Sequence, residues 1–506
     1  MSKNFNLTIE CLEGWASDPS KSNKLALTFI DDNNEDSWTY QQLWEIINNI
    51  KQNIIKHVPE KQSKILIRLP HSAEYAFCFF AAILADRIPI PASPELTDQE
   101  INFLIQDSEA RTIISEKTSN FSSKNINILS PLDLKITIKN HKNNYKSKSH
   151  QNDPAFMVYT SGTTSKPKGV IHAHRTILGR KMMKLGWENF KETDKVLHAG
   201  TLNWTYTLGV GLIDVWLAGG HAHLYSGKKE PLKLISLIEK YQITVFVAVP
   251  TVYRQILKYV DLNKYNLSNL RYGLCSGEPL PPTVLRDWQK RVKVNIYEAL
   301  GMTELSTYIS TNENIKIKPG SPGIPQPGRN VRIISEENNK NNESLAVNTP
   351  GLLAVHKSDP GLMLGYWKRD IEEQLVFRGE WFIGGDIASF DEDGYIWFHG
   401  RSDDIIKSFG YRVSPVEIET VIESLEEIAE AAVVGVNVNE NKVLIGAAVI
   451  INQSIVFNET TIKDKLKEKL AQYKMPHLIR EVNKIPRTRN GKIKRNSLKE
   501  QLKDLA

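Results

Sequence analysis

Residues 159–170 read Tyr-Thr-Ser-Gly-Thr-Thr-Ser-Lys-Pro-Lys-Gly-Val, a short stretch that combines small hydroxyl side chains with two glycines and two lysines. Glycine lets the backbone curl so that successive N–H groups point at an anion, while hydroxyl groups and lysine add donors and positive charge. The spacing differs from that of the P-loop, because Gly162 and Gly169 lie too far apart and Val170 follows. The stretch predicts a loop that holds a polyphosphate, with a polar surface turn as the simpler alternative.

Four further segments carry side chains suited to chemistry, although each alone has an ordinary explanation. A Thr-Glu dipeptide is typical of a helix start, and a lysine in a basic tail is typically a solvated charge. In chain order the segments are Ser276-Gly277-Glu278-Pro279, Tyr297-Glu298-Ala299-Leu300-Gly301-Met302-Thr303-Glu304, Gly385-Asp386 with Gly400-Arg401-Ser402-Asp403-Asp404, and Pro486-Arg487-Thr488-Arg489-Asn490-Gly491-Lys492. Together with residues 159–170 they follow one another over nearly the full length of the chain, which argues against coincidence.

In this order the five motifs resemble those of the acyl-adenylate-forming superfamily, and within it the AMP-dependent acyl- and aryl-CoA synthetases, such as benzoate–CoA ligases. The resemblance implies an α/β fold with a large N-terminal domain, residues 1–401, in which parallel-rich sheets are sandwiched with helices. This domain would bind AMP and the acyl group. The resemblance also implies a small, mobile α/β lid domain, residues 402–506, with its hinge near Asp403. We call these two predicted units the body and the lid.

The same resemblance assigns roles around the nucleotide. It implies that Lys492, Glu304 and Thr303 are catalytic, and that Glu304 binds Mg²⁺, for which a carboxylate is a hard oxygen ligand. The implied ATP-binding residues, with Asp386 on the ribose hydroxyls, are Thr160, Ser161, Gly162, Thr163, Thr164, Lys168, Gly277, Glu278, Pro279, Leu300, Gly301, Asp386, Phe398 and Arg401.

For the acid substrate, the resemblance places the pocket at Asn203, Trp204, Tyr206 and Leu305. Relatives that activate amino acids keep an aspartate in the corresponding segment, where it pairs with the ammonium group of the substrate. No aspartate occurs in residues 203–209, and Asp214 comes later. An uncharged acid, aromatic or short-to-medium aliphatic, is therefore predicted.

The thiol that receives the acyl group is expected to enter through the lid. The resemblance implies a tunnel lined by Lys407, Ser408, Gly410, Tyr411 and Arg412. Glycine allows close approach to a backbone, and the basic side chains would meet the phosphates of CoA. CoA is the predicted acceptor, and the phosphopantetheine arm of a carrier protein is the alternative, because both thiols would use the same tunnel.

Three positions depart from the family pattern. Most relatives have threonine where this chain has Gly384, many have tyrosine in place of Leu300, and many have glycine in place of Phe409. Leu300 would cover the adenine by apolar contact without a π face, so a weaker nucleotide affinity is expected. Phe409 is expected either to narrow the tunnel or to pack between the domains. None of these changes removes a group that does chemistry, so activity is expected.

Composition limits the class of protein. The 506 residues are 41% hydrophobic and 24% charged with a net charge of +6, which is typical of a globular protein of at least two domains. The positive charges are scattered, which disfavours a nucleic-acid-binding stripe. The N-terminus lacks a signal-peptide pattern, and the longest uncharged apolar run, residues 75–85, is too short to span a membrane. With an odd, widely spaced set of cysteines, these features favour a reducing cytoplasm.

Alternation of short β-branched runs with helical patterns supports the α/β class. Expected strands cover 65–69, 88–90, 245–249, 270–274, 294–297, 431–436 and 443–451, and expected helices cover 72–85 and 460–474 or begin near 250, 281 and 415. Ser414-Pro415-Val416-Glu417 resembles a capping box. Residues 119–153 and 336–343 are poor in core side chains and are expected to form exposed loops or partly disordered segments.

These inferences predict an ATP- and Mg²⁺-dependent acid–thiol ligase that forms acyl-AMP and pyrophosphate, and then acyl-CoA and AMP. A non-catalytic nucleotide-binding protein is the alternative from another class, although such a protein would have little need of Lys492. The sequence around Lys492 also resembles the site that acetyltransferases modify in bacterial relatives, and acetylation would remove its charge. A homodimer is expected from the resemblance alone.

Overall fold

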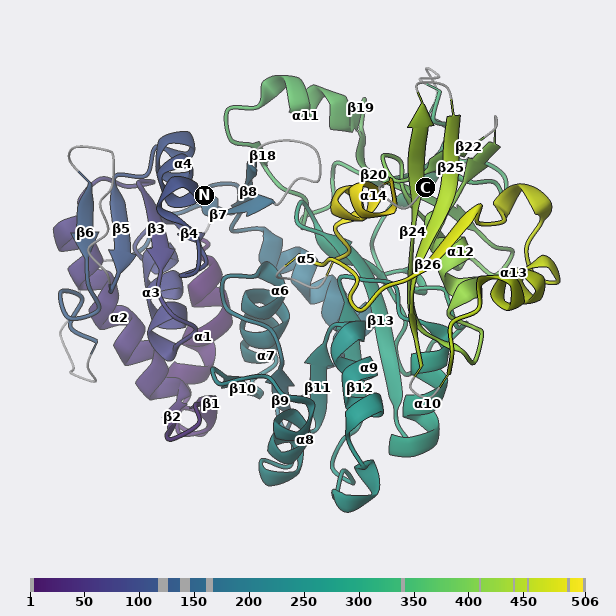
Figure 1. The fold of residues 1–506 in the computed structure, drawn as a ribbon. Helices are drawn as coiled ribbons and strands as arrows, with labels where there is room; N and C mark the ends of the chain where they lie inside the picture. Colours follow the sequence, from purple (N-terminus) through teal and green to yellow (C-terminus); the bar gives the residue numbers. More distant parts are fainter. Residues whose placement is uncertain are drawn as a thin grey trace.

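The structure, a computed structural model, describes residues 4–116, 126–136, 146–160, 167–337, 342–408, 411–439, 442–452, 455–488 and 492–503. A broad part, coloured purple to green, is followed by a smaller part coloured light green to yellow (Figure 1). Sheets and helices alternate through both, so the predicted α/β class is confirmed.

A nine-stranded sheet is the centre of the body. Its order is β15-β14-β13-β12-β11-β9-β10-β1-β2, and the strands from β13 to β1 run parallel to one another. At the edges, β2 is antiparallel to β1, β14 is antiparallel to β13, and β15 is antiparallel to β14. The strands are β1 (Leu25–Ile30), β2 (Glu35–Thr39), β9 (Lys195–His198), β10 (His221–Tyr225), β11 (Val245–Ala248), β12 (Tyr272–Ser276), β13 (Asn295–Met302), β14 (Ser306–Ser310) and β15 (Ile324–Pro325).

Apolar residues cover both faces of this sheet. On one face Val247 and Leu274 pack in a cluster with residues of α1 (Leu7–Ser17), α2 (Tyr40–His57) and α3 (Ala73–Leu84). On the other face Phe246 and Cys275 pack against α8 (Pro231–Lys240), α9 (Pro250–Tyr259) and α10 (Pro282–Val292). A parallel sheet buried on both faces leaves the ends of its strands as the place for ligands.

Three smaller sheets complete the body. A parallel sheet has the order β4-β3-β5-β6, a second has the order β18-β8-β7, and a third has the order β16-β17-β20-β19 with β21 paired to β20. Their strands are β3 (Lys64–Arg68), β4 (Ile88–Pro91), β5 (Thr112–Ser115), β6 (Asn127–Leu129), β7 (Pro154–Thr160), β8 (Lys168–Ala173), β16 (Val331–Ile334), β17 (Gly351–His356), β18 (Gly365–Tyr366), β19 (Phe377–Arg378), β20 (Trp381–Phe390) and β21 (Ile396–Arg401).

The body also contains further helices and helical turns. They are α4 (Asp98–Ser108), α5 (Thr176–Met183), α6 (Thr205–Leu208), α7 (Asp214–Leu217) and α11 (Asp370–Val376), with the π-helical turns η1 (Lys184–Glu188) and η2 (Gly209–Ile213) and the 3₁₀ turn η3 (Leu262–Lys264).

The lid contains a sheet of order β24-β25-β26 and the two-stranded ribbon β22-β23. Val433 of β24 packs toward α12 and α13, and the next residue, Val434, packs toward α14. These elements are β22 (Ile406–Ser408), β23 (Tyr411–Val413), α12 (Pro415–Ile422), β24 (Ile428–Asn439), β25 (Lys442–Ile451), α13 (Glu459–Lys467), η4 (Gln472–Lys474), β26 (Leu478–Glu481) and α14 (Arg495–Lys503). The two lid clusters contain only residues after the predicted hinge, while Ile405, next to it, packs on a body cluster. The boundaries of the domains stay a prediction.

Most expected elements are present, with shifted ends. The strand expected at 270–274 begins at Tyr272, and the strand expected at 294–297 continues to Met302. The helix expected over 460–474 ends at Lys467, and a separate 3₁₀ turn follows. Ser414 caps α12 by accepting from the N–H of Glu417, so the predicted helix start is confirmed.

The prediction of an exposed loop over 119–153 is wrong for part of the described residues, while others, such as residues 150–152, are exposed as expected. Residues 127–129 form β6, and Ser147 and Ser149 are buried. Asn6 donates from Nδ2 to Ser149 Oγ over 3.1 Å, which fixes this polar segment to the N-terminus. Residues 117–125, 137–145 and 338–341 lie outside the described residues, while Glu336, Glu337 and Glu343 are exposed as expected. In the part of the chain that the structure covers, no helix is long and apolar enough to cross a membrane.

A buried carboxyl in β13 makes stability depend on pH. Glu298 accepts from the N–H of Leu280 over 3.0 Å, and burial raises its pKa to about 8. Because the folded chain keeps this proton above the pH at which the unfolded chain releases it, the free energy of unfolding should fall as pH rises from about 5 to 8. This group alone would contribute roughly 1.4 kcal/mol per pH unit in that range.

Glu298→Gln should keep the acceptor for Leu280 and remove this pH dependence. Urea unfolding of both proteins between pH 5 and 9 measures it, and equal slopes for the two proteins would contradict the assignment.

Candidate active site

Thr303 and Glu304 lie in the turn that joins β13 to β14, at one end of the nine-stranded sheet. The Tyr366 hydroxyl donates to Glu304 Oε1 over 2.8 Å. Burial, assisted by the negative charge of Glu304, raises the pKa of Tyr366. Tyr366 therefore stays a hydrogen-bond donor and orients the carboxylate that is the predicted Mg²⁺ ligand.

Tyr366 also connects this turn to the predicted phosphate loop. It lies in β18, which pairs with β8, and Lys168 Nζ lies 5.4 Å from the centre of its ring. Thr160 at the end of β7 pairs in register with Lys168 at the start of β8, so the two ends of the loop are held together. Ser161, Gly162, Thr163 and Thr164 lie outside the described residues.

Asp386 and Arg401 face each other across β20 and β21. They are register partners, and Arg401 Nη1 lies 3.0 Å from Asp386 Oδ1 while donating to the carbonyl of Gly384 over 2.6 Å. Asp386 is buried, whereas the Arg401 side chain is 46% exposed and can meet a ligand. Phe398 is half-buried on β21, the strand that also carries Arg401.

The departure at Gly384 has a steric explanation. A Cβ at this position would lie 2.5 Å from Cε of Met302 in β13. The flexible end of the Met302 side chain occupies this space and would have to shift for any larger residue at position 384. Leu300 is half-buried in the same apolar cluster as Met302.

The loop after β12 carries Gly277, Glu278 and Pro279. Gly277 has a φ of +97°, a conformation that glycine adopts readily. Glu278 Oε2 accepts from the Thr251 hydroxyl over 3.0 Å, and Glu278 Oε1 lies 3.2 Å from Nη1 of Arg487 in the lid. Burial raises the pKa of Glu278 despite Arg487. Pro279 is exposed.

Three of the predicted acyl-pocket residues lie close in sequence, and two of them belong to an aromatic cluster. Tyr206 of α6 lies with its ring centre 5.2 Å from that of Trp204, 4.7 Å from that of His198 and 6.3 Å from that of Trp187. A Cβ at Gly277 would meet Trp204 at 3.5 Å, so the cluster borders the loop after β12. Asn203 precedes α6 and is half-buried.

Leu305 is not part of this cluster. It is buried with Val170 and Phe382 in a separate apolar cluster under β14 and β20. Its role in the acyl pocket stays a prediction that no described contact supports.

Two polar atoms in the aromatic cluster have no partner. Tyr206 Oη and His198 Nε2 are buried without a hydrogen-bond partner among the described residues. Burial, then the charges of Lys229 and His71, lowers the pKa of His198, which is therefore neutral. Its Nδ1 accepts from the N–H of Gly200 over 2.8 Å, so Nε2 carries the proton. A buried donor without an acceptor indicates a place where a ligand or water supplies one.

Asp214 is not available to a substrate ammonium group. Its Oδ1 and Oδ2 lie 2.5 Å and 2.6 Å from Nε and Nη2 of Arg180, and both residues are buried. This agrees with the prediction that the acid is uncharged.

Lys492 closes a turn in the lid. Its carbonyl accepts from the N–H of Thr488 over 2.7 Å, its own N–H donates to Thr488 Oγ1 over 3.2 Å, and the side chain is exposed. Arg487 and Ile493 form an isolated antiparallel bridge at the base of this hairpin. The chain after β26 leaves the lid toward the body, where Arg487 lies against Glu278 (Figure 1).

The structure places some of the predicted hinge and CoA-binding residues. Asp403 is exposed in the turn after β21. Lys407 pairs in register with Arg412, and Ser408 with Tyr411, which gives the ribbon β22-β23. Ser408 is buried, and its hydroxyl donates to the carbonyl of Val443 over 2.7 Å, so it serves the lid core in this arrangement. Phe409 and Gly410 lie outside the described residues.

The sequence reasoning missed Tyr366 and the pairing of Arg487 with Glu278. The aromatic run Gly365-Tyr366-Trp367 could have indicated the first. The second joins residues 209 positions apart, and no local pattern could have indicated it.

Residues 15–367 match the family model of AMP-binding enzymes, and residues 417–492 match that of the AMP-binding enzyme C-terminal domain. The protein belongs to the AMP-binding enzyme family. The prediction of an acyl-adenylate-forming α/β enzyme is confirmed.

Known relatives of this AMP-binding enzyme are ligases. It is 30% identical to an uncharacterized acyl–CoA ligase of Bacillus subtilis (strain 168), over 95% of this chain and 94% of the relative. It is 28% identical to a mitochondrial acyl-coenzyme A synthetase of Mus musculus, over 98% and 90%. The crystal structure of an anthranilate CoA ligase in complex with anthranoyl-AMP superposes with a TM-score of 0.88 at 26% identity, over 99% and 98%.

Gly301 supports the turn that carries Thr303 and Glu304 in this AMP-binding enzyme. A Cβ there would lie 2.6 Å from the carbonyl oxygen of Ser306 and 2.7 Å from Cα of Thr307, both backbone atoms of β14. Gly301→Ala should therefore force β13 and β14 apart and destabilise the fold by about 1–3 kcal/mol. Thermal unfolding measures this.

Gly14→Ala is the matched control, because a Cβ at Gly14 in α1 would meet nothing within 4 Å. It should be neutral or stabilising by up to about 1 kcal/mol. An unchanged thermal midpoint for Gly301→Ala would contradict the prediction, because it would show that β14 can move away from residue 301 without loss of stability.

Proposed function

We propose that this AMP-binding enzyme activates an uncharged carboxylic acid with ATP and Mg²⁺ and transfers the acyl group to CoA. Family membership supports the reaction class. The observation that carries the assignment of residues is that Glu304, Tyr366 and Lys168 meet at the end of the central sheet. Glu304 ends in the oxygen ligands that Mg²⁺ prefers.

The described residues suit a magnesium ion that arrives with the nucleotide. No three His, Cys, Asp or Glu side chains in the described ranges gather as a metal cage. A single carboxylate together with substrate phosphates and water is the arrangement that Mg²⁺ commonly takes in nucleotide sites. When bound, Mg²⁺ would neutralise phosphate charge, and Tyr366 would keep Glu304 aimed at it.

The chemical difficulty is that one anion must attack another. The carboxylate oxygen of the acid attacks the α-phosphorus of ATP, the bond to the β-phosphate breaks, and pyrophosphate leaves. The thiol of CoA then attacks the carbonyl carbon of the acyl-adenylate, and AMP leaves. In the first step Lys492 is proposed to bridge the carboxylate and the α-phosphate, Thr303 and residues 160–164 to hold the phosphates, and Asp386 with Arg401 to hold the ribose.

The other roles follow the same proposal. Gly277 to Pro279 and Leu300 with Gly301 would line the adenine, and Asp403 would be the hinge. The thiol tunnel would be lined by Lys407, Ser408, Gly410, Tyr411 and Arg412. A carrier protein in place of CoA, a homodimer and a cytoplasmic location stay predictions. Because Lys492 is exposed, it remains accessible to the predicted acetyltransferase.

The function is tested by mixing the protein with ATP, Mg²⁺ and a panel of acids, with and without CoA, and following AMP and thioester by mass spectrometry. CoA-dependent thioester is expected. AMP without thioester would favour a carrier protein as acceptor, and no product with any acid would favour the non-catalytic alternative.

Lys492→Ala should separate the two steps. Loss of one positioned charge commonly lowers a rate by about 10²–10³-fold, so pyrophosphate release should nearly cease. Thioester formation from a supplied acyl-adenylate should continue at a similar rate. Equal loss in both steps would contradict the role given to Lys492.

The unpartnered atoms of Tyr206 and His198 predict that the preferred acid carries an oxygen acceptor. Tyr206→Phe should lower kcat/KM about tenfold or more for such an acid, because the variant leaves that oxygen unpaired. It should leave the unsubstituted analogue unchanged. A comparison of 3-hydroxybenzoate with benzoate, or of hydroxylated and plain aliphatic acids, measures this, and an equal effect on both members of a pair would argue that water fills the site.

A further inference from the structure

Five charged side chains meet between the body and the lid. Arg254 of α9 and Glu278 after β12 come from the body, and Glu423 after α12, Glu430 of β24 and Arg487 come from the lid. Each side chain is only 13–20% exposed. We call these five residues the interdomain charge cluster.

The contacts of this cluster cross the domain boundary three times. Arg254 Nη2 lies 3.4 Å from Glu423 Oε1, and Arg254 Nη1 lies 3.4 Å from Glu430 Oε2. Arg487 Nη1 lies 3.2 Å from Glu278 Oε1, while its Nη2 pairs with Glu430 inside the lid. Glu430 therefore connects the two arginines, and the five charges form one network.

The network is poorly solvated. Burial raises the pKa of Glu423 to about 7, although Arg254 acts in the opposite direction. The cluster also holds three carboxyl groups for two guanidinium groups. Partly buried ion pairs of this kind depend on every partner, because removal of one leaves the others uncompensated.

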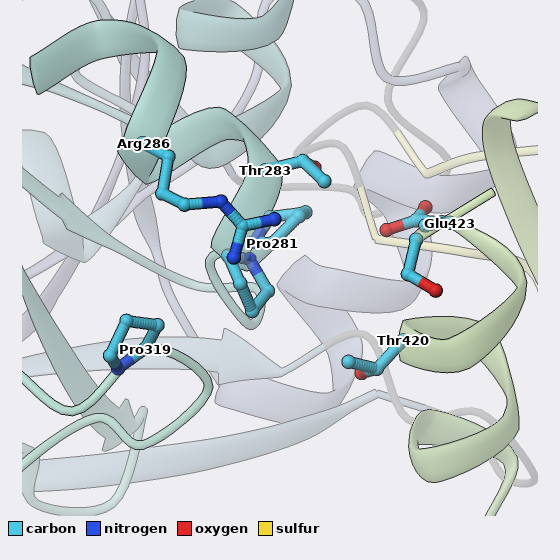
Figure 2. A pocket seen from close by; sticks show the side chains of 8 residues that line it. Pro281, Thr283, Arg286, Pro319, Thr420 and Glu423 are labelled. Carbon is cyan, nitrogen blue, oxygen red and sulfur yellow. The ribbon is translucent and has the colours of Figure 1, made fainter. Parts of the chain in front are cut away.

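Next to the cluster, a cavity separates the body from the lid, so the two are not packed together there. A cavity of about 280 Å³ lies between the domains, and Glu423 belongs both to its wall and to the cluster. Figure 2 shows Pro281, Thr283, Arg286 and Pro319 of the body around this cavity, opposite Glu423 and Thr420 of the lid. Charge contacts therefore help to hold this part of the lid on the body.

The cluster is continuous with the hairpin that carries Lys492. Arg487 bridges Ile493 at the base of that hairpin, and the N–H of Thr488 donates to the carbonyl of Lys492. The pairing of Arg487 with Glu278 thus holds the hairpin against the loop that we assign to the adenine.

We propose that Arg254, Glu423 and Glu430 are positioning residues that latch the lid in the orientation required for adenylation. The latch must open before the lid can turn for the thioester step. This inference rests on the proposed two-step function. It concerns side chains that would touch neither the acid nor the nucleotide.

The test compares half-reactions in the full chain. Arg254→Met keeps the bulk of the side chain and removes its charge. Pyrophosphate release without CoA should slow about tenfold, which corresponds to roughly 1.4 kcal/mol in the barrier. Thioester formation from a supplied acyl-adenylate should be unchanged or faster. Arg254→Lys, which keeps the charge, should recover part of the adenylation rate.

Lys258→Met is the matched control, because Lys258 is exposed on the same helix, α9. It should leave both half-reactions unchanged. Glu423→Gln tests the latch from the lid side, and the double variant Arg254→Met/Glu423→Gln should be no slower than the worse single variant. Thermal unfolding of each variant shows whether slower adenylation comes from a lost latch or from loss of the folded structure.

The latch would be overturned if Arg254→Met and Glu423→Gln slowed both half-reactions equally, or if these variants slowed neither half-reaction. Failure of the wild-type protein to make acyl-adenylate from any acid would instead overturn the proposed function. The two failures are therefore distinguishable.

Discussion

The structure depends on the burial of a parallel sheet on both faces. Helices cover the two faces, so the ends of the strands are the part of the sheet that remains for ligands. The loop with Gly277 follows β12, the Thr303-Glu304 turn follows β13, and His198 ends β9. Segments that lie about a hundred residues apart are brought to one region because neighbouring strands end together. This constraint explains why one site is assembled from motifs spread along the chain.

Much of this arrangement could be predicted from the sequence. Motifs with strong local signatures could be recognised in the sequence. Thr160 and Lys168 of the stretch 159–170 lie at the end of β7 and the start of β8, whereas the Gly385-Asp386 pair lies within β20. Element ends were predicted less well, since the length of β13 depends on its pairing with β14 rather than on its own side chains. The described part of 119–153 looked like a loop because it has few apolar side chains and because two of its buried side chains, Ser147 and Ser149, are polar and accept from Asn6. The pairing of Tyr366 with Glu304 and that of Arg254 with the lid could not be predicted, because these partners come from distant elements.

Two groups of buried charges differ in the length of their contacts, and this difference corresponds to where they lie. Arg180 and Asp214 form a two-pronged pair inside the body, and both side chains are buried. In the interdomain charge cluster, the contacts that cross between body and lid are longer, and the cluster lies beside a cavity. A tight internal pair suits a fixed wall, whereas a looser network can separate without breaking an apolar core. The same residue types thus form a rigid pair in one place and, in the latch that we propose, contacts that can open in another.

The three cysteines have a consequence for handling the reactive intermediate. Cys11, Cys78 and Cys275 are all fully buried, and burial raises the pKa of each thiol. An acyl-adenylate would react readily with an accessible thiolate, so an enzyme that makes one benefits from presenting none of its own. The same feature makes the chain a convenient scaffold for spectroscopy. A single cysteine introduced on the surface of the lid would be the one thiol open to a fluorescent or spin label, and lid rotation could then be followed in the otherwise native sequence.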